Sequence, residues 1–417
     1  MIDVADLINR KFCFDSRKVE NGCVFVAIKG EKYDGHDFAS EALSKGASFV
    51  VVEKDLGIKN QIITDSVVDF LIDLASKKIK SSMVVGITGS SGKTFTKEIL
   101  ARLIPNSFKS TRNMNTEIGL PISILNEYSG EKFSILEMGV NKRGDIKKLC
   151  RIKKPKIGVV LNVGRQHLGM FSSERELFEA KMEMFECSDL KVYNADDGRM
   201  TEYVGNSGKS MGFGKANGKC KLKDWKYFNL ETQAVYEISG ETYYLRFNKL
   251  AHEGHLLNVA ASICVLNLLD LPFDPTRIIH LPRIPQRFDV KIVKGILIID
   301  DTYNASLLSF EKAVQALMLL DGRKFAVVGP ILEQGKYSKE THESLSDILS
   351  ELDGVFVLDG FEGSEHIRPK NLVFRSANRE KLVENVMSHL RPGDVVLFKA
   401  SRGVKMEKVL EKVVKWI

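Results

Sequence analysis

The sequence contains no long apolar run, which argues against a protein that spans a membrane with helices. No run approaches the roughly 18 apolar residues that a membrane helix needs, and Met1–Asp6 lacks the basic and apolar regions of a secretory signal. The six cysteines include no CxxC pair, which argues against a zinc ribbon or a disulfide framework. We therefore expect a cytoplasmic protein with reduced thiols and no membrane span.

The composition is that of a folded chain. The 417 residues are 44% hydrophobic and 28% charged, and at roughly 150 residues per domain this length predicts two or three domains. Lys and Arg (61) exceed Asp and Glu (54), which gives a net charge of +7. This excess fits a mildly basic surface, a nucleic-acid binder or a protein that faces anionic small molecules. The basic residues are spread out, and the densest cluster, Lys153–Lys156, is short, so we expect no nucleic-acid partner.

The order of patterns along the chain predicts an α/β protein of three domains. Residues 1–80 read as a small α/β domain, residues 81–281 as a central domain with a parallel sheet, and residues 282–417 as a Rossmann-like doubly wound domain. Expected strands include 83–87, 133–136, 156–163 and 190–193, then 296–299, 324–328, 354–358 and 395–398. Expected helices are 93–103, 173–185, 258–269 and 310–320, and residues 225–247 read as a β-meander.

A phosphate-binding loop is predicted between the first central strand and the helix after it. Residues 88–94 read Thr-Gly-Ser-Ser-Gly-Lys-Thr, so backbone N–H groups could surround phosphate oxygens, Lys93 could neutralise them and Thr94 could hold Mg²⁺. The general pattern places a glycine at position 87, whereas this chain has Gly86 and Ile87. The plainer alternative is a Gly/Ser turn without a ligand.

Two side chains after later strands are candidate ligands. Glu137 ends a strand, at the sheet edge where open α/β sheets bind ligands, and a carboxylate there could hold a metal; the alternative is a solvated strand end. His167 lies in the loop after strand 156–163. A loop histidine is more often structural, and histidine is a poor match for Mg²⁺.

Lys181 interrupts an apolar helix face. A Ser173–Glu176 capping box begins the helix, and Leu177, Lys181 and Met184 fall on one side of it. The ammonium could snorkel to water. Alternatively, burial favours the neutral amine, which can add CO₂, and the resulting carbamate is an anionic oxygen ligand for Mg²⁺.

Together these motifs resemble the Mur ligase family, the ATP-dependent amide-forming enzymes of peptidoglycan synthesis. Residues 15–17, 22–27 and 30–36 resemble the UDP-sugar-binding domain of that family, and residues 113–121 resemble its substrate segment, with Thr116 in place of an asparagine and Arg112 in place of a glycine. The resemblance implies that the UDP-linked substrate is bound by Ser16, Arg17, Gly30, His36, Asn115 and Thr116.

The resemblance also implies an ATP and metal site. ATP would be bound by Thr88, Gly89, Ser90, Ser91, Gly92, Lys93, Thr94, Asn258, Arg287 and Asp301. The metal site, for one or two Mg²⁺ ions, would use Thr94, Glu137, His167 and carbamylated Lys181. The catalytic set would be Lys93, Glu137, His167, Lys181 and Arg287, with Arg287 reaching the γ-phosphate.

The segment 300–305, Asp-Asp-Thr-Tyr-Asn-Ala, resembles the members that add D-alanyl-D-alanine to UDP-N-acetylmuramoyl tripeptide. Tyr303 and Asn304 would then contact the dipeptide. Pro330 and Gln334 depart from the pattern of that subfamily in residues 329–335, and Ala400 replaces a glycine in a Lys-Gly-Ser-Arg motif.

The implied reaction phosphorylates the tripeptide carboxylate and then lets the dipeptide amine attack the acyl phosphate, in a monomer. The proton acceptor stays unassigned, and the third residue of the acceptor peptide is not predicted. Three alternatives stay open. They are a Mur-type or folylpolyglutamate-synthase-like ligase that adds one residue, a P-loop kinase or ATPase, and a nucleotide-gated binding protein without turnover.

Overall fold

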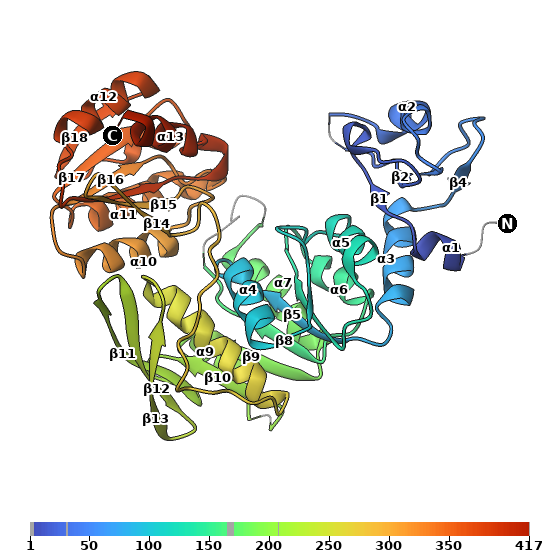
Figure 1. The fold of residues 1–417 in the computed structure, drawn as a ribbon, viewed down its shortest axis with the longest axis horizontal. Helices are drawn as coiled ribbons and strands as arrows, with labels where there is room; N and C mark the ends of the chain where they lie inside the picture. The colour runs from blue at the N-terminus through green and yellow to red at the C-terminus, as the bar shows by residue number, and fades with distance from the viewer. Residues whose placement is uncertain (1–3, 31, 165–170, 207, 417) are drawn as a thin grey trace. The chain divides into compact units, whose positions relative to one another are not determined.

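The computed structural model describes residues 4–30, 32–164, 171–206 and 208–416 (Figure 1). The chain forms two compact units, one of residues 1–88, 100–160 and 179–191, and one of residues 89–99, 161–178 and 192–417. Three elements run across the division: α4 (Lys93–Leu103), α7 (Glu174–Cys187) and β9 (Leu190–Asn194). Each unit is therefore described by itself.

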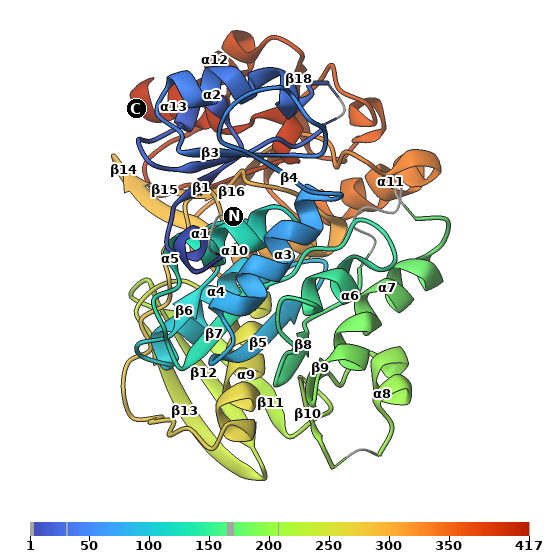
Figure 2. The same cartoon turned by 90° about the vertical axis from the view of Figure 1, so that its right-hand side faces the viewer.

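The first unit begins with a small parallel sheet. Its order is β1-β2-β3-β4, and its strands are β1 (Phe12–Cys13), β2 (Val24–Val26), β3 (Phe49–Val52) and β4 (Gln61–Ile63). Figure 2 shows α2 (Ala39–Ser44) lying along this sheet, and Ala39 and Ala42 pack in one cluster with Phe25 and Val50. Single-turn helices η1 (Ser16–Lys18) and η2 (Gly35–Phe38) occupy two of its loops.

A second parallel sheet region in this unit has the order β8-β5-β7-β6. Its strands are β8 (Ile157–Val160), β5 (Met83–Thr88), β7 (Phe133–Glu137) and β6 (Phe108–Lys109). The α-helices that lie wholly within this unit are, besides α2, α1 (Val4–Ile8), α3 (Val67–Lys78), α5 (Gly119–Glu127) and α6 (Asp145–Cys150). The register pairs Ile87 with Glu137 and Thr88 with Val160. The carboxyl ends of these strands therefore share one edge of the sheet.

Helix α7 packs unusually close to β5. A Cβ atom added at Gly86 would lie 3.0 Å from the Met184 sulfur and 3.1 Å from Pro155 Cγ. A larger residue at position 86 would push α7 away, because both neighbours are buried. The glycine that lies one position early in the phosphate-loop pattern is thus explained by helix packing.

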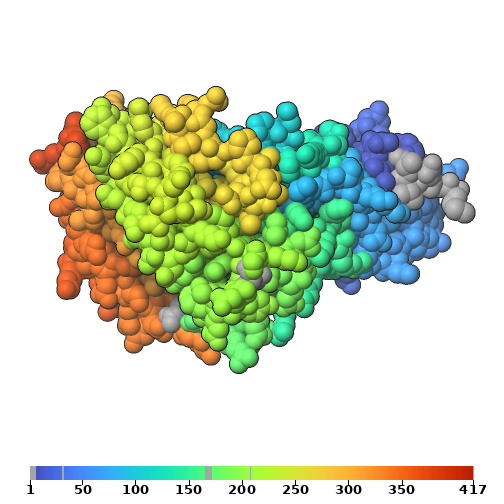
Figure 3. All heavy atoms as spheres, turned by 90° about the horizontal axis from the view of Figure 1, so that it is seen from below, coloured from blue at the N-terminus to red at the C-terminus, as the bar shows by residue number. Residues whose placement is uncertain are grey.

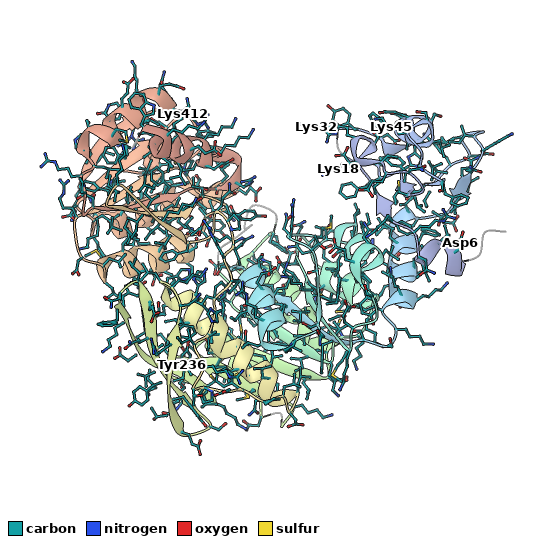
Figure 4. All side chains as sticks on the ribbon, in the orientation of Figure 1. Asp6, Lys18, Lys32, Lys45, Tyr236 and Lys412 are labelled. Atoms are coloured by element: carbon teal, nitrogen blue, oxygen red, sulfur yellow. The ribbon has the colours of Figure 1, made fainter. Side chains whose placement is uncertain are left out.

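The second unit contains an antiparallel meander of β11 (Cys220–Phe228), β12 (Glu231–Ile238) and β13 (Glu241–Phe247), and β10 (Ser210–Gly214) pairs with β11 in parallel. Helix α9 (Glu253–Leu268) lies along it, and Figure 4 labels Tyr236, whose buried hydroxyl donates to Leu256 O of α9 at 2.9 Å. On the face seen in Figure 3, the yellow-green residues around 220–250 form much of the visible surface.

A six-stranded sheet of order β14-β15-β19-β16-β17-β18 ends the second unit. Only β14 is antiparallel, and residues 298, 327 and 396 face one helix layer while 299, 328 and 397 face the other. This two-sided burial confirms the predicted doubly wound arrangement. Its strands are β14 (Asp289–Val293), β15 (Ile296–Asp301), β16 (Lys324–Val328), β17 (Gly354–Leu358), β18 (Leu372–Ser376) and β19 (Val395–Lys399). The helices of the second unit, besides α9, are α8 (Gly198–Val204), α10 (Leu307–Met318), α11 (Ser338–Leu349), α12 (Arg379–His389) and α13 (Glu407–Trp416).

The α/β class is confirmed, and most predicted elements are present. α9 begins five residues before its predicted start, because His252 acts as its N-cap. None of the helices in the described ranges has the length and apolar character of a bilayer-spanning segment. The predicted domain boundaries near residues 80 and 281 stay predictions.

Candidate functional site

The predicted phosphate loop is held in shape by the loop that follows β8. Asn162 accepts a hydrogen bond from Ser91 N at 2.9 Å and donates to Ser91 O at 3.2 Å, while Ser90 N donates to Asn162 O at 3.0 Å. The Ser90 hydroxyl donates to Gly164 O and accepts from Gly164 N. Asn162 was not predicted from the sequence, although a polar residue directly after a buried strand was the available signal.

We expect Asn162→Ala to weaken ADP binding by roughly tenfold, because about two net hydrogen bonds that shape the loop are lost. Isothermal titration with ADP measures the change. Asn126→Ala is a matched control, since Asn126 makes the same two-way pair with Phe12 N and O. Equal ADP affinity in Asn162→Ala and the unmodified protein would contradict this role.

The side chains of Lys93, Thr94 and Thr88 lie at the phosphate loop and differ in their contacts and burial. Lys93 Nζ donates to Gly89 O at 2.7 Å, which uses one of the three N–H donors of the ammonium. Thr94 is 6% exposed. The Thr88 hydroxyl is fully buried and has no hydrogen-bond partner within the described part of the chain. An orphaned buried hydroxyl at the start of this loop fits a site that receives a polar ligand.

Gly92 and Asn258 are in direct contact. Gly92 has a φ of +84°, and a Cβ atom added there would lie 2.5 Å from the Asn258 amide nitrogen. Asn258 is 5% exposed and lies on α9. The resemblance places Asn258 near the adenine; in this structure the same side chain lies directly against Gly92 of the phosphate loop.

A stack of three aromatic rings, two buried (Phe95 and His255) and one half-buried (His252), joins α4 to the start of α9. The Phe95 and His255 rings stack with centroids 4.0 Å apart, and His255 stacks on His252 at 3.7 Å. Burial lowers the pKa of His252 to about 4 and that of His255 well below its ordinary value. His252 Nδ1 accepts from His255 N, which requires a neutral ring with its proton on Nε2.

This stack predicts a pH dependence of stability. An unfolded His252 binds a proton near pH 6.5 and the folded one only near pH 4, so the free energy of unfolding should fall as the pH drops from about 6.5 to 4. His252 alone contributes on the order of 3 kcal/mol. His252→Asn keeps a helix cap and should flatten the dependence over this range in urea titrations at several pH values. Identical pH dependence in both proteins would contradict the prediction.

Arg287 and Tyr303 form a second group in this unit. The Arg287 guanidinium lies over the Tyr303 ring, 3.9 Å from its centroid, and Tyr303 N donates to Gln286 O at 2.9 Å. Arg402 donates to Gln286 Oε1 at 2.9 Å. The predicted γ-phosphate arginine is thus stacked on a residue predicted to contact the dipeptide.

Asp301 forms a salt bridge that the sequence analysis did not predict. Lys399, 1% exposed, donates to its carboxylate and to Asn304 O, and Phe288 N donates to the other Asp301 oxygen at 3.0 Å. A buried lysine without this carboxylate would be a costly isolated charge. Asp301 therefore supports the segment that carries Tyr303 and Asn304.

Glu137 lies in the first unit and is bound by a residue from the predicted substrate segment. Asn115 Nδ2 donates to Glu137 Oε1 at 2.8 Å, and the Ser110 hydroxyl accepts from Glu137 N. Glu137 is 2% exposed, so the solvated alternative is wrong. The structure thereby joins a predicted metal ligand to a predicted UDP-substrate residue.

Lys181 is buried in the first unit, with 3% of its surface exposed. This burial argues against the snorkelling alternative, in which the charged end of the side chain is solvated. On the opposite side of α7, the Glu183 carboxylate accepts from Gly144 N at 2.7 Å and from Lys147 N at 3.3 Å. Helix α7 is therefore fixed in rotation against the start of α6.

The predicted UDP-binding residues of the small sheet differ in accessibility. Arg17 is 84% exposed at its side chain and pairs with Asp15, which lowers the pKa of that carboxyl to about 2. His36 is buried and uses both ring nitrogens, on Asp34 Oδ1 and Glu53 N. Ser16 O accepts from Lys45, Gly30 N donates to Tyr33 O, and the Thr116 hydroxyl accepts from Gly119 N. His167 lies outside the described residues.

Three family models match the chain. They are the "Mur ligase family, catalytic domain" over residues 12–102, the "Mur ligase middle domain" over 87–266 and the "Mur ligase, glutamate ligase domain" over 286–402. Among curated proteins, the UDP-N-acetylmuramoyl-tripeptide–D-alanyl-D-alanine ligase of Bacillus subtilis is 28% identical and spans 96% of this chain and 92% of its own length. The enzyme of the same description from Escherichia coli is 27% identical over 97% and 94%.

A solved structure of close similarity is the MurF ligase from Thermotoga maritima in complex with ADP. It is 42% identical to this chain, covers 98% of both chains and superimposes with a TM-score of 0.94. A folylpolyglutamate synthase from Mycobacterium tuberculosis is 12% identical with a TM-score of 0.60, which shows a shared fold alone.

Proposed function

The chain belongs to the Mur ligase family, and from this premise we propose that it joins D-alanyl-D-alanine to UDP-N-acetylmuramoyl tripeptide with cleavage of ATP to ADP, in peptidoglycan precursor synthesis. The observation that carries the proposal is the phosphate loop, which Asn162 holds through two hydrogen bonds to Ser91. The relatives named for this activity match the chain over nearly its whole length.

The chemistry requires two anions to meet, because the tripeptide carboxylate must attack the γ-phosphate of ATP. Backbone N–H groups of the loop and Lys93 would hold the phosphates, and Arg287 would stabilise the charge that develops in transfer. A new bond forms between the carboxylate oxygen and the γ-phosphorus, and the bond from that phosphorus to the oxygen that stays on ADP breaks. The dipeptide amine then attacks the acyl carbon, phosphate leaves, and the amine gives its proton to a group that we leave unassigned.

The residues present fit Mg²⁺. No cluster of three or more His, Cys, Asp or Glu side chains in the described ranges could hold a metal. Mg²⁺ bound with a nucleotide needs no such cluster, since it uses one or two protein oxygens, phosphates and water. Thr94 and the buried Glu137 carboxylate are the oxygen donors that we propose, with His167 as a predicted neighbour. Mg²⁺ would neutralise phosphate charge and polarise the transferred group.

We also propose that Lys181 is carbamylated. The side chain is buried on a rotationally fixed helix, and addition of CO₂ to its neutral amine would give an anionic oxygen donor. In this role Lys181 positions a metal and does not act as a base.

Further assignments complete the proposal. Ser16, Arg17, Gly30, His36, Asn115 and Thr116 would bind the UDP-linked substrate, and Tyr303 and Asn304 the dipeptide. We assign the UDP sugar to residues 1–80, ATP to 81–281 and the dipeptide to 282–417, with closure on binding. The cytoplasmic location stays a prediction.

The test is an assay of amide product with ATP, Mg²⁺, UDP-N-acetylmuramoyl tripeptide and either D-alanyl-D-alanine or single amino acids. We expect product with the dipeptide and little with any single amino acid. Faster amide formation with a single amino acid would move the chain to the alternative Mur-type branch. Phosphate transfer to a hydroxyl, or ATP hydrolysis independent of the tripeptide, would indicate a kinase or ATPase.

A further inference from the structure

The backbone on both sides of Arg287 has an unusual conformation. Gln286 has a φ of +65° and Phe288 a φ of +50°, in the left-handed region that residues other than glycine rarely adopt. Such a backbone persists only where neighbouring groups fix it. Here Tyr303 N donates to Gln286 O at 2.9 Å, and the Asp301 carboxylate accepts from Phe288 N at 3.0 Å. These two hydrogen bonds therefore fix the backbone from which the Arg287 side chain extends.

A series of rings connects this backbone to α4, the helix that begins at the phosphate loop. The Phe288 ring, 4% exposed, meets the His252 and His255 rings edge to face, with centroids 4.9 and 5.9 Å away. His255 in turn stacks on Phe95 of α4 with centroids 4.0 Å apart. The residue next to Arg287 is therefore packed, through His255, against the phosphate-loop helix.

The Arg287 guanidinium is held by an aromatic ring. Its carbon Cζ lies over the Tyr303 ring, 3.9 Å from the ring centroid, where the π electrons attract a cation. This contact uses the face of the guanidinium, so the five N–H donors in its plane stay available. Within the described parts of the chain, no oxygen atom accepts a hydrogen bond from this guanidinium. Arg287 thus keeps the paired donors that suit a phosphate group.

Arg402 lies near the same ring but has other partners. Its Cζ is 5.6 Å from the Tyr303 centroid, it donates to Gln286 Oε1 at 2.9 Å, and its guanidinium lies 3.8 Å from the Glu407 carboxylate. Of these two arginines, Arg287 is therefore the one whose donors are available to an anionic ligand.

We propose that Tyr303 is a positioning residue, whose ring holds the Arg287 guanidinium so that its N–H donors reach the γ-phosphate of ATP. This inference rests on the nucleotide part of the proposed function, and it adds to the predicted contact of Tyr303 with the dipeptide. The ring carries the role, so the phenol hydroxyl is not needed for it. ADP has no γ-phosphate, so the role affects the binding of ATP and not that of ADP.

The experiment titrates the full-length protein with ADP and with β,γ-methylene ATP, each with Mg²⁺, by calorimetry. Tyr303→Leu should bind the ATP analogue roughly fivefold more weakly and ADP without change, because only the analogue carries a γ-phosphate. Tyr303→Phe keeps the ring and should bind both nucleotides like the unmodified protein. Equal weakening of both nucleotides in Tyr303→Leu, unchanged affinity for the analogue, or a Tyr303→Phe that behaves like Tyr303→Leu would overturn the proposal.

A double-mutant cycle tests whether the ring acts through Arg287. Arg287→Ala should weaken binding of the analogue selectively, and adding Tyr303→Leu should cause no further loss. A comparable further loss in the Arg287→Ala background would show that the ring acts independently, against the proposal.

Tyr337→Leu is the matched control. Tyr337 is half-buried like Tyr303, and Lys336 Nζ lies over its ring, 5.2 Å from the centroid. This variant should keep both affinities. A selective loss of analogue affinity in the control as well would mean that the effect is not specific to Tyr303, and would contradict the proposal.

These titrations use neither the tripeptide nor the dipeptide, so they are separate from the test of the ligase reaction. If amide formation fails while Tyr303→Leu shows the selective loss, the proposed function is wrong and the role of Tyr303 stands. Amide formation without the selective loss would leave the ligase reaction in place and remove the role of Tyr303.

Discussion

Replacing Gly92 with alanine is expected to abolish ligase turnover and to weaken ATP binding strongly. The left-handed backbone at this position, with a φ of +84°, costs alanine about 1–2 kcal/mol. The new methyl group would also lie 2.5 Å from the Asn258 amide, which is buried and has little room to move. The loop must therefore shift, and a displacement of about 1 Å at reacting groups can reduce the rate on the order of 100-fold.

The matched control for Gly92→Ala is Gly130→Ala. Gly130 also has a positive φ, of +107°, but no atom lies within 4 Å of a Cβ added there. It therefore shares the backbone cost without the steric contact. We expect Gly130→Ala to lose some thermal stability and to keep its affinity for ATP, measured by titration with a non-hydrolysable analogue. Equal nucleotide affinity in Gly92→Ala and Gly130→Ala would contradict the role of the Gly92–Asn258 contact.

Lys181→Ala is expected to lower turnover by roughly 100-fold or more, because the proposed carbamate and its contact with a metal would be lost. Added short carboxylates such as acetate should restore part of the activity by occupying the space of the carbamate. NMR of the unmodified protein with isotope-labelled bicarbonate should give a carbamate signal that Lys181→Ala lacks.

Lys93→Ala provides the control for that rescue. Its loss removes a cation, so carboxylates should not restore its turnover. Full turnover in Lys181→Ala, or equal rescue of both variants by acetate, would show that Lys181 does not act as a carbamate.

The sequence pattern predicted helices and strands well where the periodicity of apolar residues and the flanking turn residues determine their bounds. The helix Lys93–Leu103 and the strands Lys324–Val328 and Gly354–Leu358 have the predicted bounds. The start of α9 was predicted too late because histidine is not among the usual N-cap residues, and His252 accepts as a cap because burial keeps its ring neutral. The short strands β6 and β10 were not predicted.

The contacts within the site depended on pairing between distant segments. Asn162 meets Ser91 because β5 and β8 pair with Thr88 opposite Val160, which places the two following loops side by side. The contacts of Asn115 with Glu137 and of Lys399 with Asp301 likewise join residues from separate elements. Sequence patterns singled out Glu137 and Lys181, and the resemblance to the family added Arg287, but neither supplied the partners of these residues.

The proposed ligase reaction is tested most directly by following an oxygen atom. UDP-N-acetylmuramoyl tripeptide is prepared with a heavy-oxygen label in its terminal carboxylate and incubated with ATP, Mg²⁺ and D-alanyl-D-alanine. An acyl-phosphate route transfers one labelled oxygen to each phosphate released, in step with amide formation. We predict this transfer. Unlabelled phosphate, released whether or not the tripeptide is present, would contradict the ligase mechanism.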